Sequence, residues 1–311
     1  MLGARVAVVG SLNADVTLPV EHLPGPGETV LTRGPAHLAF GGKGANQAAA
    51  AAAFGGQVAM IGRVGNDDNG HRIVADLAAR GIDCSGVLLT DGERTGTAMI
   101  AVDRAGENLI IVDPGANSRL EPRDVAAAPL AQTTVLLVQL EIPLLAVAAA
   151  VRASQALVVL NPAPAMPIDP AILEFVHVLV PNRSELAALA GARLPGSLDG
   201  IARLASKIAD ATDIVVTLGE DGALVVPGDG GPATHIAAPR TDVTDGTGAG
   251  DCFCGSLAVL LAEGADLASA ARVAVAAATI STTGRGARGR LPGRPEAEQL
   301  AAGLRGEQAD S

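Results

Sequence analysis

The sequence predicts an α/β protein, a three-layer α/β/α sandwich with a mainly parallel central sheet and a small second sheet. Short β-branched runs, such as residues 6–9 and 135–138, alternate with helical stretches along most of the chain. That alternation predicts β-α-β units, which place helices on both faces of a parallel sheet. Residues 15–39 and 95–113 break the alternation and predict a separate small sheet.

The central sheet and its helices come from regularly spaced segments. Turn residues bound the runs expected to form buried strands, which are residues 6–9, 58–61, 135–138, 158–160, 176–180 and 214–218. Helical composition marks residues 44–54, 71–80, 143–153, 184–190, 198–209, 248–263 and 267–283. We expect residues 1–305 to form one domain and residues 306–311 to form a disordered tail.

The small sheet is expected from two segments that differ in composition. Residues 15–39 are rich in Pro and Gly, and residues 95–113 have the pattern of two strands around a turn at residues 104–106. Such a sheet would serve either as a lid over a substrate cleft or as an extension of the sheet edge. The sequence pattern leaves both uses open.

Charge and cysteine content exclude several classes of protein. The formal net charge of -11 argues against a nucleic-acid partner, because binding to a phosphate backbone needs clustered Lys and Arg. Cys84, Cys252 and Cys254 form no C-x-x-C pair, which favours core packing in a reducing cytoplasm. The first residues have no signal-peptide pattern, and the Ala-rich run at 48–53 is far below the roughly 20 residues that span a bilayer.

The strongest motif is the glycine-rich segment that leads into the helix expected at 248–263. Gly246, Gly248 and Gly250 allow successive backbone N–H groups to surround a phosphate oxygen, and the helix dipole adds positive charge there. Asp251 lies at the mouth of this anion site. Its carboxylate would either take a proton from an attacking hydroxyl or simply complement the helix dipole.

Two further segments carry polar side chains suited to a sugar. Residues 41–47 place Lys43 and Asn46 at the start of an Ala-rich helix, as donors to ligand oxygens or as a solvated helix terminus. Asn13 and Asp15 follow the first strand, at the end of a parallel sheet where ligands bind. A carboxylate and an amide together suit a vicinal diol.

Asn182 and Glu185 lie where a predicted strand ends and a helix begins. Their oxygens suit a Mg²⁺ that keeps most of its waters, but a helix cap is the interpretation that the pattern favours. The chain lacks the G-x-x-x-x-G-K-[ST] spacing of a P-loop and the early G-x-G-x-x-G of a dinucleotide-binding fold. A nicotinamide-dependent dehydrogenase is therefore disfavoured.

Together and in order, these motifs resemble the ribokinase family of sugar kinases, the PfkB-type carbohydrate kinases. The resemblance covers about residues 6–292. It rests on residues 10–15 (GSLNAD), 26–30 (PGETV), 40–48 (FGGKGANQA), 115–117 (GAN), 138–141 (VQLE), 161–165 (NPAPA), 181–185 (PNRSE), 217–222 (TLGEDG) and 245–251 (DGTGAGD). The resemblance implies the ribokinase-like version of the predicted sandwich, with the small sheet as a lid at about residues 15–39 and 95–113.

The resemblance also implies roles for individual residues. Those that would hold the sugar hydroxyls are Asn13, Asp15, Gly42, Lys43, Asn46 and Glu141, with Asp251 as the base at the 5-hydroxyl. Those that would line the nucleotide site are Asn182, Thr217, Gly219, Gly222 and Gly250. The anion hole for the transferring phosphoryl group would be the backbone of Gly248, Ala249 and Gly250. Asn182 and Glu185 would serve Mg²⁺, through water.

A monovalent cation, usually K⁺, is implied beside the anion hole. By similarity its ligands would be Asp245 and the carbonyls of Thr247, Ser281, Gly284 and Gly286. The sequence departs from the family pattern at Arg290, which stands where a hydroxyl ligand is usual. An inward guanidinium would replace the ion, and an outward one would leave a looser site. Val275 likewise stands where a polar residue near the adenine is common.

The implied activity is ATP-dependent phosphorylation of D-ribose at the 5-hydroxyl, giving ribose 5-phosphate. A related kinase for deoxyribose, another sugar or a nucleoside is the alternative of the same class, and a non-catalytic sugar-binding protein is the alternative from another class. The implied setting is cytoplasmic, with no membrane partner. A homodimer formed through the lid is the implied assembly.

Overall fold

The computed structural model describes residues 5–307, except residues 129, 131 and 210. Within these residues one sheet has nine strands and a second has four. The strands of the large sheet are β1 (Arg5–Val9), β4 (Gln57–Gly65), β5 (Asp83–Thr90), β8 (Val135–Val138), β9 (Leu157–Leu160), β10 (Val178–Leu179), β11 (Asp213–Thr217), β12 (Ala223–Val226) and β13 (Thr234–Ile236). The strands of the small sheet are β2 (Asn13–Pro19), β3 (His37–Gly41), β6 (Gly96–Val102) and β7 (Asn108–Asp113).

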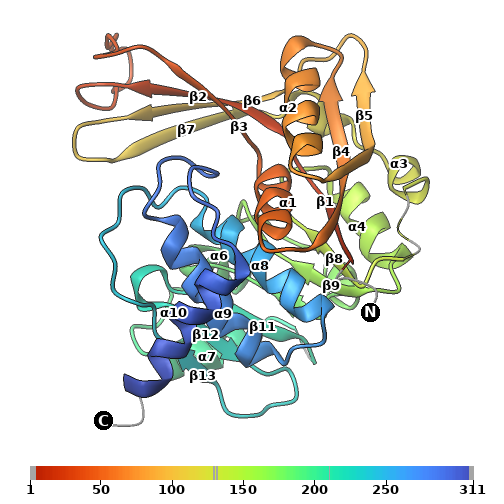
Figure 1. Ribbon diagram of the computed structural model, residues 1–311, viewed down its shortest axis with the longest axis vertical. Coiled ribbons are helices and arrows are strands. Elements are labelled where there is room, and N and C mark those ends of the chain that lie inside the picture. Colours follow the sequence, from red (N-terminus) through yellow and green to blue (C-terminus); the bar gives the residue numbers. More distant parts are fainter. Residues whose placement is uncertain (1–4, 129, 131, 210, 308–311) are drawn as a thin grey trace.

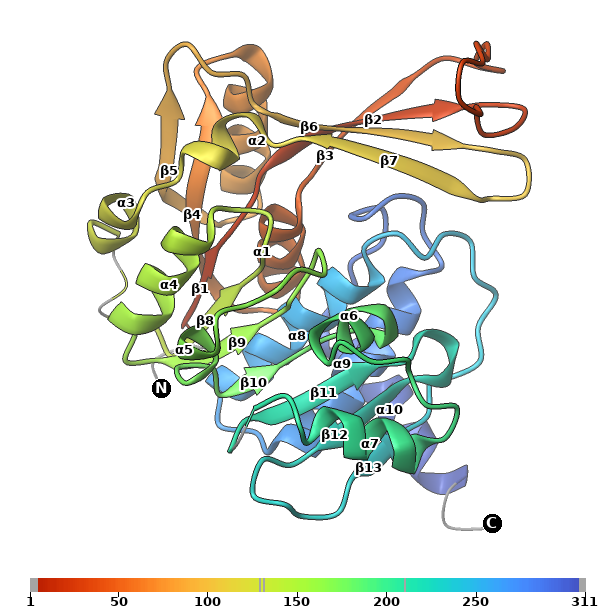
Figure 2. The same ribbon diagram turned by 180° about the vertical axis from the view of Figure 1, so that it is seen from behind.

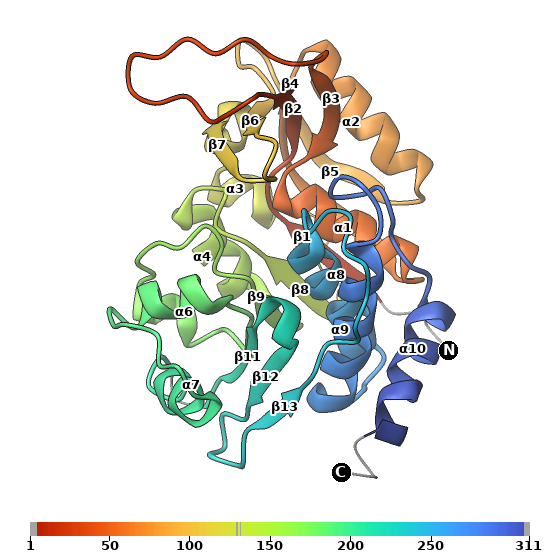
Figure 3. The same ribbon diagram turned by 90° about the vertical axis from the view of Figure 1, so that its left-hand side faces the viewer.

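The helices cover the large sheet on both faces (Figure 3). They are α1 (Lys43–Ala53), α2 (Asp68–Ala79), α3 (Pro122–Ala126), α4 (Leu144–Ala153), α5 (Pro170–Leu173), α6 (Arg183–Leu189), α7 (Leu198–Ala205), α8 (Ala249–Ala262), α9 (Leu267–Ser281) and α10 (Arg294–Glu307), with short 3-10 turns η1 (Gly115–Arg119) and η2 (Gly219–Asp221).

The strand order of the large sheet is β13-β12-β11-β10-β9-β8-β1-β4-β5, and that of the small sheet is β3-β2-β6-β7 (Figure 1). The strands from β11 to β5 pair in parallel, whereas β12 and β13 pair antiparallel at one edge. The predicted α/β fold, with a mainly parallel sheet and a separate small one, is confirmed.

Strand β1 shows how the two helix layers are held. Val6 and Val8 belong to the core shared with α1, α2, α8, α9 and α10. Ala7 and Val9 belong to the core shared with α3, α4, α5, α6 and α7. Successive side chains of a strand point to opposite faces, so a strand with apolar residues at every position is buried on both sides.

The small sheet lies at the carboxyl end of β1. Strand β1 ends at Val9 and β2 begins at Asn13, so only three residues separate the two sheets. Figures 1 and 2 show the small sheet standing off this end of the molecule. Polar residues that follow β1, β8 and β10 therefore lie at the same carboxyl end of the large sheet.

Several expected boundaries shift in the structure. The strand expected at 176–180 is shorter in the structure, where β10 spans only Val178–Leu179. The helices expected at 71–80 and 198–209 span Asp68–Ala79 and Leu198–Ala205. Strands β5, β12 and β13 and helices α3, α5 and α10 were not expected. Helix α10 includes residues 306 and 307 of the expected tail, and residues 308–311 lie outside the described residues. Of the helices described here, none combines the length and apolar character that crossing a membrane requires.

Candidate active site

Asp251 lies in the first turn of α8, close to the beginning of α1. Helix α8 follows Gly248, whose φ of 77° lies in the left-handed region that glycine adopts without strain. Further along α8, Gly255 packs against the backbone of α1, because a Cβ there would lie 2.6 Å from the carbonyl oxygen of Gln47. This close approach of the two helices places Asp251 within reach of side chains from α1.

Two amide side chains of α1 hold the Asp251 carboxylate. Asn46 Nδ2 donates to Oδ2 at 3.1 Å, and Gln47 Nε2 donates to Oδ1 at 3.0 Å. Burial raises the pKa of Asp251, while the Lys43 ammonium and the two amide donors oppose that rise. A buried carboxylate with fixed donors is suited to accepting a proton from a bound hydroxyl.

Gln47 is itself fixed by a buried network. Gln139 Nε2 donates to Gln47 Oε1 at 2.6 Å, and Gln47 Nε2 also lies 3.1 Å from Asn161 Oδ1. Gln47 was not predicted as an individual site residue, although it lies inside the 41–47 motif. Its neighbours Gln139 and Asn161 also lie in motifs of the sequence, but only the fold shows that they join.

Glu141 and Asp15 bring two more carboxyl groups to the same region. Glu141 Oε2 accepts a hydrogen bond from Ser11 Oγ at 2.5 Å and another from the backbone N–H of Lys43 at 3.1 Å. Asp15 Oδ1 is buried and has no hydrogen-bond partner among the described residues. Burial and then Glu141 raise the pKa of Asp15 to about 7, against the lowering effect of Arg288.

Glycines make room for the side chains of strand β2. A Cβ on Gly41 would lie 1.8 Å from Asp15 Oδ2, and one on Gly42, where φ is 83°, would lie 2.8 Å from the backbone nitrogen of Asn13. Asn13 Oδ1 accepts a hydrogen bond from Asn117 Nδ2 at 2.7 Å. That bond fixes the amide of Asn13, and its own donor group is then available to a ligand.

Lys43 is the cation among these acidic groups. Burial lowers the pKa of Lys43, but the carboxylates of Asp251, Glu141 and Glu185 outweigh it, and the pKa is raised overall. The side chain is therefore a protonated donor within the carboxylate cluster. The structure brings together all seven residues expected around the sugar: Asn13, Asp15, Gly42, Lys43, Asn46, Glu141 and Asp251.

The residues expected around a nucleotide line one open cleft of about 1330 Å³. Asn182, Thr217, Gly219, Gly222 and Gly250 all contribute to its surface. Gly219 has a φ of 69° and open space around its missing Cβ, so its backbone faces the cleft freely. Ala249, Phe253 and Val275 line the cleft as well.

Asn182 and Glu185 form the helix cap that the sequence favoured. Asn182 Oδ1 accepts from the backbone N–H of Glu185 at 2.8 Å, and Glu185 Oε2 accepts from the backbone N–H of Asn182 at 2.8 Å. Burial raises the pKa of Glu185, and Lys43 partly offsets this. The cap holds a buried carboxylate beside the cleft.

The loop around Asp245 folds against the loop after α9. Asp245 Oδ1 accepts from the N–H of Thr247 at 2.9 Å, and Oδ2 accepts from the N–H of Gly286 at 2.8 Å. Burial tends to raise the pKa of Asp245, but these hydrogen bonds lower it overall. The N–H of Gly284 donates to the carbonyl of Ser281 at 3.2 Å, which closes the turn after α9.

Arg290 points away from this loop pair. Its guanidinium forms an ion pair with Glu296 of α10, and 49% of the side chain is exposed. Of the two orientations left open by the sequence, the structure has the outward one. No group of three or more His, Cys, Asp and Glu side chains with the spacing of a metal centre occurs in the part of the chain that the structure describes.

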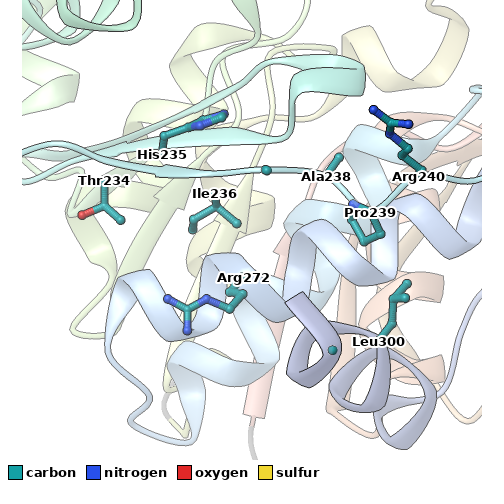
Figure 4. Close-up of a pocket in the computed structure, with 10 residues that line it drawn as sticks. Thr234, His235, Ile236, Ala238, Pro239, Arg240, Arg272 and Leu300 are labelled. Atoms are coloured by element: carbon teal, nitrogen blue, oxygen red, sulfur yellow. The ribbon is translucent and has the colours of Figure 1, made fainter. Parts of the chain in front are cut away.

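A second pocket, of about 700 Å³, lies between β13, α9 and α10 and contains none of the expected site residues. Figure 4 shows Arg240 and Arg272 on opposite sides of the 236–239 segment, with guanidinium groups that do not converge. The arrangement offers no single anion-binding point.

Arg288 is the main residue of the site that sequence reasoning missed. It donates from Nε to Asn46 Oδ1 at 2.9 Å, although it lies 242 residues away in the chain. An arginine in a Gly-rich loop has the local appearance of a solvated side chain. Sequence reasoning singled out Arg290 instead, and no local pattern distinguishes the two arginines.

Known sugar kinases resemble this chain in sequence and in structure. The chain is 37% identical over 298 residues to a ribokinase of Haemophilus influenzae (94% of this chain, 96% of that protein) and 34% identical over 296 residues to a deoxyribokinase of Salmonella typhi (92% and 95%). It is also similar to the structure of Arabidopsis thaliana ribokinase complexed with ribose and ATP (TM-score 0.84, 29% identity, 96% and 99% covered). The sequence pattern of the pfkB family carbohydrate kinases matches residues 4–294, and the chain belongs to that family.

Proposed function

We propose that this kinase transfers the γ-phosphoryl group of ATP to the 5-hydroxyl of D-ribose, giving ribose 5-phosphate. The observation that carries the proposal is the position of Asp251. Its buried carboxylate lies between the sugar-binding cluster and the cleft for the nucleotide, held by two amides. The similarity to ribokinases, including one complexed with ribose and ATP, supports this acceptor and donor.

The sugar would occupy the polar cluster around Asp15. Asp15 Oδ1 has no partner in the described chain, so it is the acceptor available to a sugar hydroxyl. Asn13, Lys43 and Asn46 would donate to the remaining sugar oxygens, with Glu141 accepting and Gly42 allowing the close approach. The 5-hydroxyl would then face Asp251, which takes its proton as the oxygen attacks phosphorus.

The transferring phosphoryl group would lie at the start of α8. The backbone N–H groups of Gly248, Ala249 and Gly250 lie at the positive end of the helix dipole, and that of Ala249 donates to the carbonyl of Gly246 at 3.2 Å in the absence of a ligand. Loss of one such donor typically lowers the rate by roughly 100-fold to 1000-fold. The nucleotide would extend from this point along Asn182, Thr217, Gly219 and Gly222.

The proposal includes two cations, each of which would be held by oxygen atoms. Glu185 is a buried carboxylate beside the cleft, and with Asn182 it would hold a hydrated Mg²⁺, which neutralises phosphate charge when bound. For K⁺, the ionised Asp245 would act with the carbonyls of Thr247, Ser281, Gly284 and Gly286. The outward Arg290 does not replace the ion, but the site then lacks the usual hydroxyl ligand and is expected to be looser.

The small sheet would act as a lid and as a dimer contact. Asp15 lies on β2, so the sheet carries part of the sugar site and can close it against water. A single domain would then comprise residues 1–305, with the lid at about residues 15–39 and 95–113. Exposed apolar side chains on the lid favour a homodimer. The three free thiols fit a cytoplasmic setting.

Deoxyribose is the second candidate acceptor. The similarity to a deoxyribokinase is nearly as high as that to ribokinase, so overall likeness does not separate the two sugars. The two sugars differ at the 2-hydroxyl, and a site built to bind that group would discriminate strongly against its absence.

A panel of acceptors tests the proposal. Release of ADP from ATP would be measured with ribose, 2-deoxyribose, other pentoses, fructose and nucleosides, each with K⁺ and with a tetraalkylammonium salt in its place. We expect the highest kcat/KM with ribose and a rise in activity with K⁺. A higher kcat/KM with deoxyribose or a nucleoside would reassign the acceptor, and sugar-independent ADP release alone would contradict the proposal.

A further inference from the structure

Arg288 is a buried cation that links the sugar site to the loop after α9. Only 7% of its side chain is exposed. Its three donor nitrogens face three different elements: Nε lies 2.9 Å from Asn46 Oδ1, Nη1 3.0 Å from Asp76 Oδ2, and Nη2 3.3 Å from the carbonyl oxygen of Gly41. The planar fork of an arginine suits this division of contacts.

The chain around Arg288 is shaped to turn the side chain inward. Gly286 has a φ of 76°, and its N–H donates to Asp245. Gly289 closes the turn by donating to the carbonyl of Gly286 at 3.0 Å, and a Cβ on Gly289 would lie 1.8 Å from the carbonyl oxygen of Arg285. The turn is thus fixed at Asp245 on one side and through Arg288 on the other.

The contact with Arg288 fixes the orientation of the Asn46 amide. A guanidinium has only donors and an ionised carboxylate has only acceptors. Because Asn46 lies between Arg288 and Asp251, only one orientation satisfies both: Oδ1 toward Arg288 and Nδ2 toward Asp251. Without the guanidinium, Oδ1 of Asn46 would lose its donor, and the amide would be held by the Asp251 carboxylate alone.

Arg288 also supplies positive charge where acidic groups gather. Burial lowers the pKa of Arg288, and the carboxylates of Asp76 and Asp15 oppose that effect. In the other direction, Arg288 lowers the pKa of Asp15, which Glu141 and Asp251 raise. The guanidinium therefore favours the ionised form of a carboxyl group that the sugar would meet.

We propose that Arg288 is a positioning residue for sugar binding, which orients the amide of Asn46 and holds the Gly41 and Asp15 region of the small sheet in place. This inference rests on the proposed function, since Asn46 and Asp15 are taken as ligands of the sugar. Arg288 itself touches neither the sugar nor the nucleotide. It acts through the residues that do.

The test compares Arg288→Met and Arg288→Lys with Arg80→Met. Arg80 is the matched control because it pairs with the same carboxylate, Asp76, from the exposed side and does not touch Asn46. For Arg288→Met the KM for ribose should rise by about 10-fold to 100-fold, the range expected for loss of charge-assisted hydrogen bonds. The KM for ATP should stay within about twofold in all three variants, and Arg80→Met should keep the ribose KM as well.

Arg288→Lys keeps the inference testable if Arg288→Met does not fold. Lysine retains the charge that faces Asp76, but a single ammonium lacks the fork that reaches both Asn46 and Gly41. We expect folded Arg288→Lys to show a raised ribose KM also. A ribose KM within about twofold of the parent in this variant would overturn the inference, because the contacts rather than the charge alone are claimed to matter.

A double-mutant cycle checks that Arg288 acts through Asn46. If it does, Arg288→Met should add much less to the ribose KM in an Asn46→Ala background than in the parent enzyme. Full additivity would contradict the inference. Asp251→Asn in the same assay distinguishes failure of the proposed function from failure of this inference. If Asp251→Asn keeps its turnover, the proposed active site is wrong. If Asp251→Asn is inactive but Arg288→Met has the ribose KM of the parent, only the role of Arg288 is wrong.

Discussion

The buried carboxyl group of Asp15 lies close to other acidic groups, and hydroxyl groups of a bound sugar would supply it with hydrogen-bond donors. Its carboxyl is buried close to Glu141 and Asp251, and its pKa is raised to about 7. The folded protein therefore holds a proton on Asp15 at pH values where the unfolded chain, near the ordinary 3.8, has lost it. Between these two values the group makes the fold less stable as pH rises.

Asp15→Asn should therefore stabilise the ligand-free protein while weakening its activity. The variant lacks the buried charge, so its melting temperature should exceed that of the parent at pH 8, and the difference should shrink at pH 5, where Asp15 is protonated in the fold. Its ribose KM should rise because a donor replaces part of the acceptor. Calorimetry at the two pH values and steady-state kinetics measure both effects.

The exposed Asp199, in the first turn of α7, provides a control. Because the Asp199 side chain is exposed, Asp199→Asn should not raise the melting temperature at pH 8. An equal shift for Asp15→Asn at the two pH values would show that the Asp15 carboxyl is not held in its protonated form by the fold.

Among individual residues, sequence motifs predicted those whose chemistry is visible within a short segment. Asp251, Lys43 and Asn46 follow glycine-rich turns, and those turns led to the site that the fold assembles. Arg288 could not be found in this way, because its partners Asn46 and Asp76 belong to helices far away in the chain. The inward direction of a side chain depends on which elements surround it, and composition does not contain that information.

Among the elements, the small sheet has an exposed apolar face. The pairing register aligns Leu38, Val16, Met99 and Ile111 across β3, β2, β6 and β7, and we call these four residues the apolar row. Asp15 precedes Val16 on β2, so its side chain points to the opposite face, toward the sugar site. Ile111 is 62% exposed and Met99 is 48% exposed, which is unusual for large apolar residues so close together.

The apolar row predicts that the chain is a dimer and that a charge in the row disrupts it. Ile111→Lys would bury an ammonium without a partner at the contact, so the variant should sediment as a monomer at concentrations where the parent is a dimer. Leu145→Lys is the control, since Leu145 is 74% exposed on α4, outside the small sheet. A monomeric parent, or a dimeric Ile111→Lys variant, would contradict the lid contact.

The elements that the sequence predicted best are the buried parallel strands, whose runs of Val, Ile and Leu are continuous. Strand β8, with all four residues buried, was predicted with its exact bounds. Strand β5 has mixed composition and includes Gly86, which must approach Met60 closely on the neighbouring strand. Helix α10 is polar along most of its length, and burial of Ala297 and Ala301 against the rest of the fold is what holds it. Such edges and terminal elements depend on tertiary contacts.

Across the whole molecule, the parallel order of the sheet explains why distant motifs share one site. Strands β1, β8 and β10 end at the same edge, and the segments that follow them carry Asp15, Glu141 and Asn182. Helices α1 and α8 then pack together and bring Asn46 and Asp251 into contact. An acidic chain can handle phosphate at this point because the helix terminus supplies backbone donors.

The proton acceptor is the central claim, and Asp251→Asn tests it most directly. Ribose binding would be measured by isothermal titration calorimetry, and phosphoryl transfer by ADP release with saturating ribose and ATP. We predict ribose affinity within a few-fold of the parent and turnover lower by at least roughly 100-fold, as expected when a positioned base is removed. Turnover close to that of the parent, in a variant that binds ribose normally, would contradict the account.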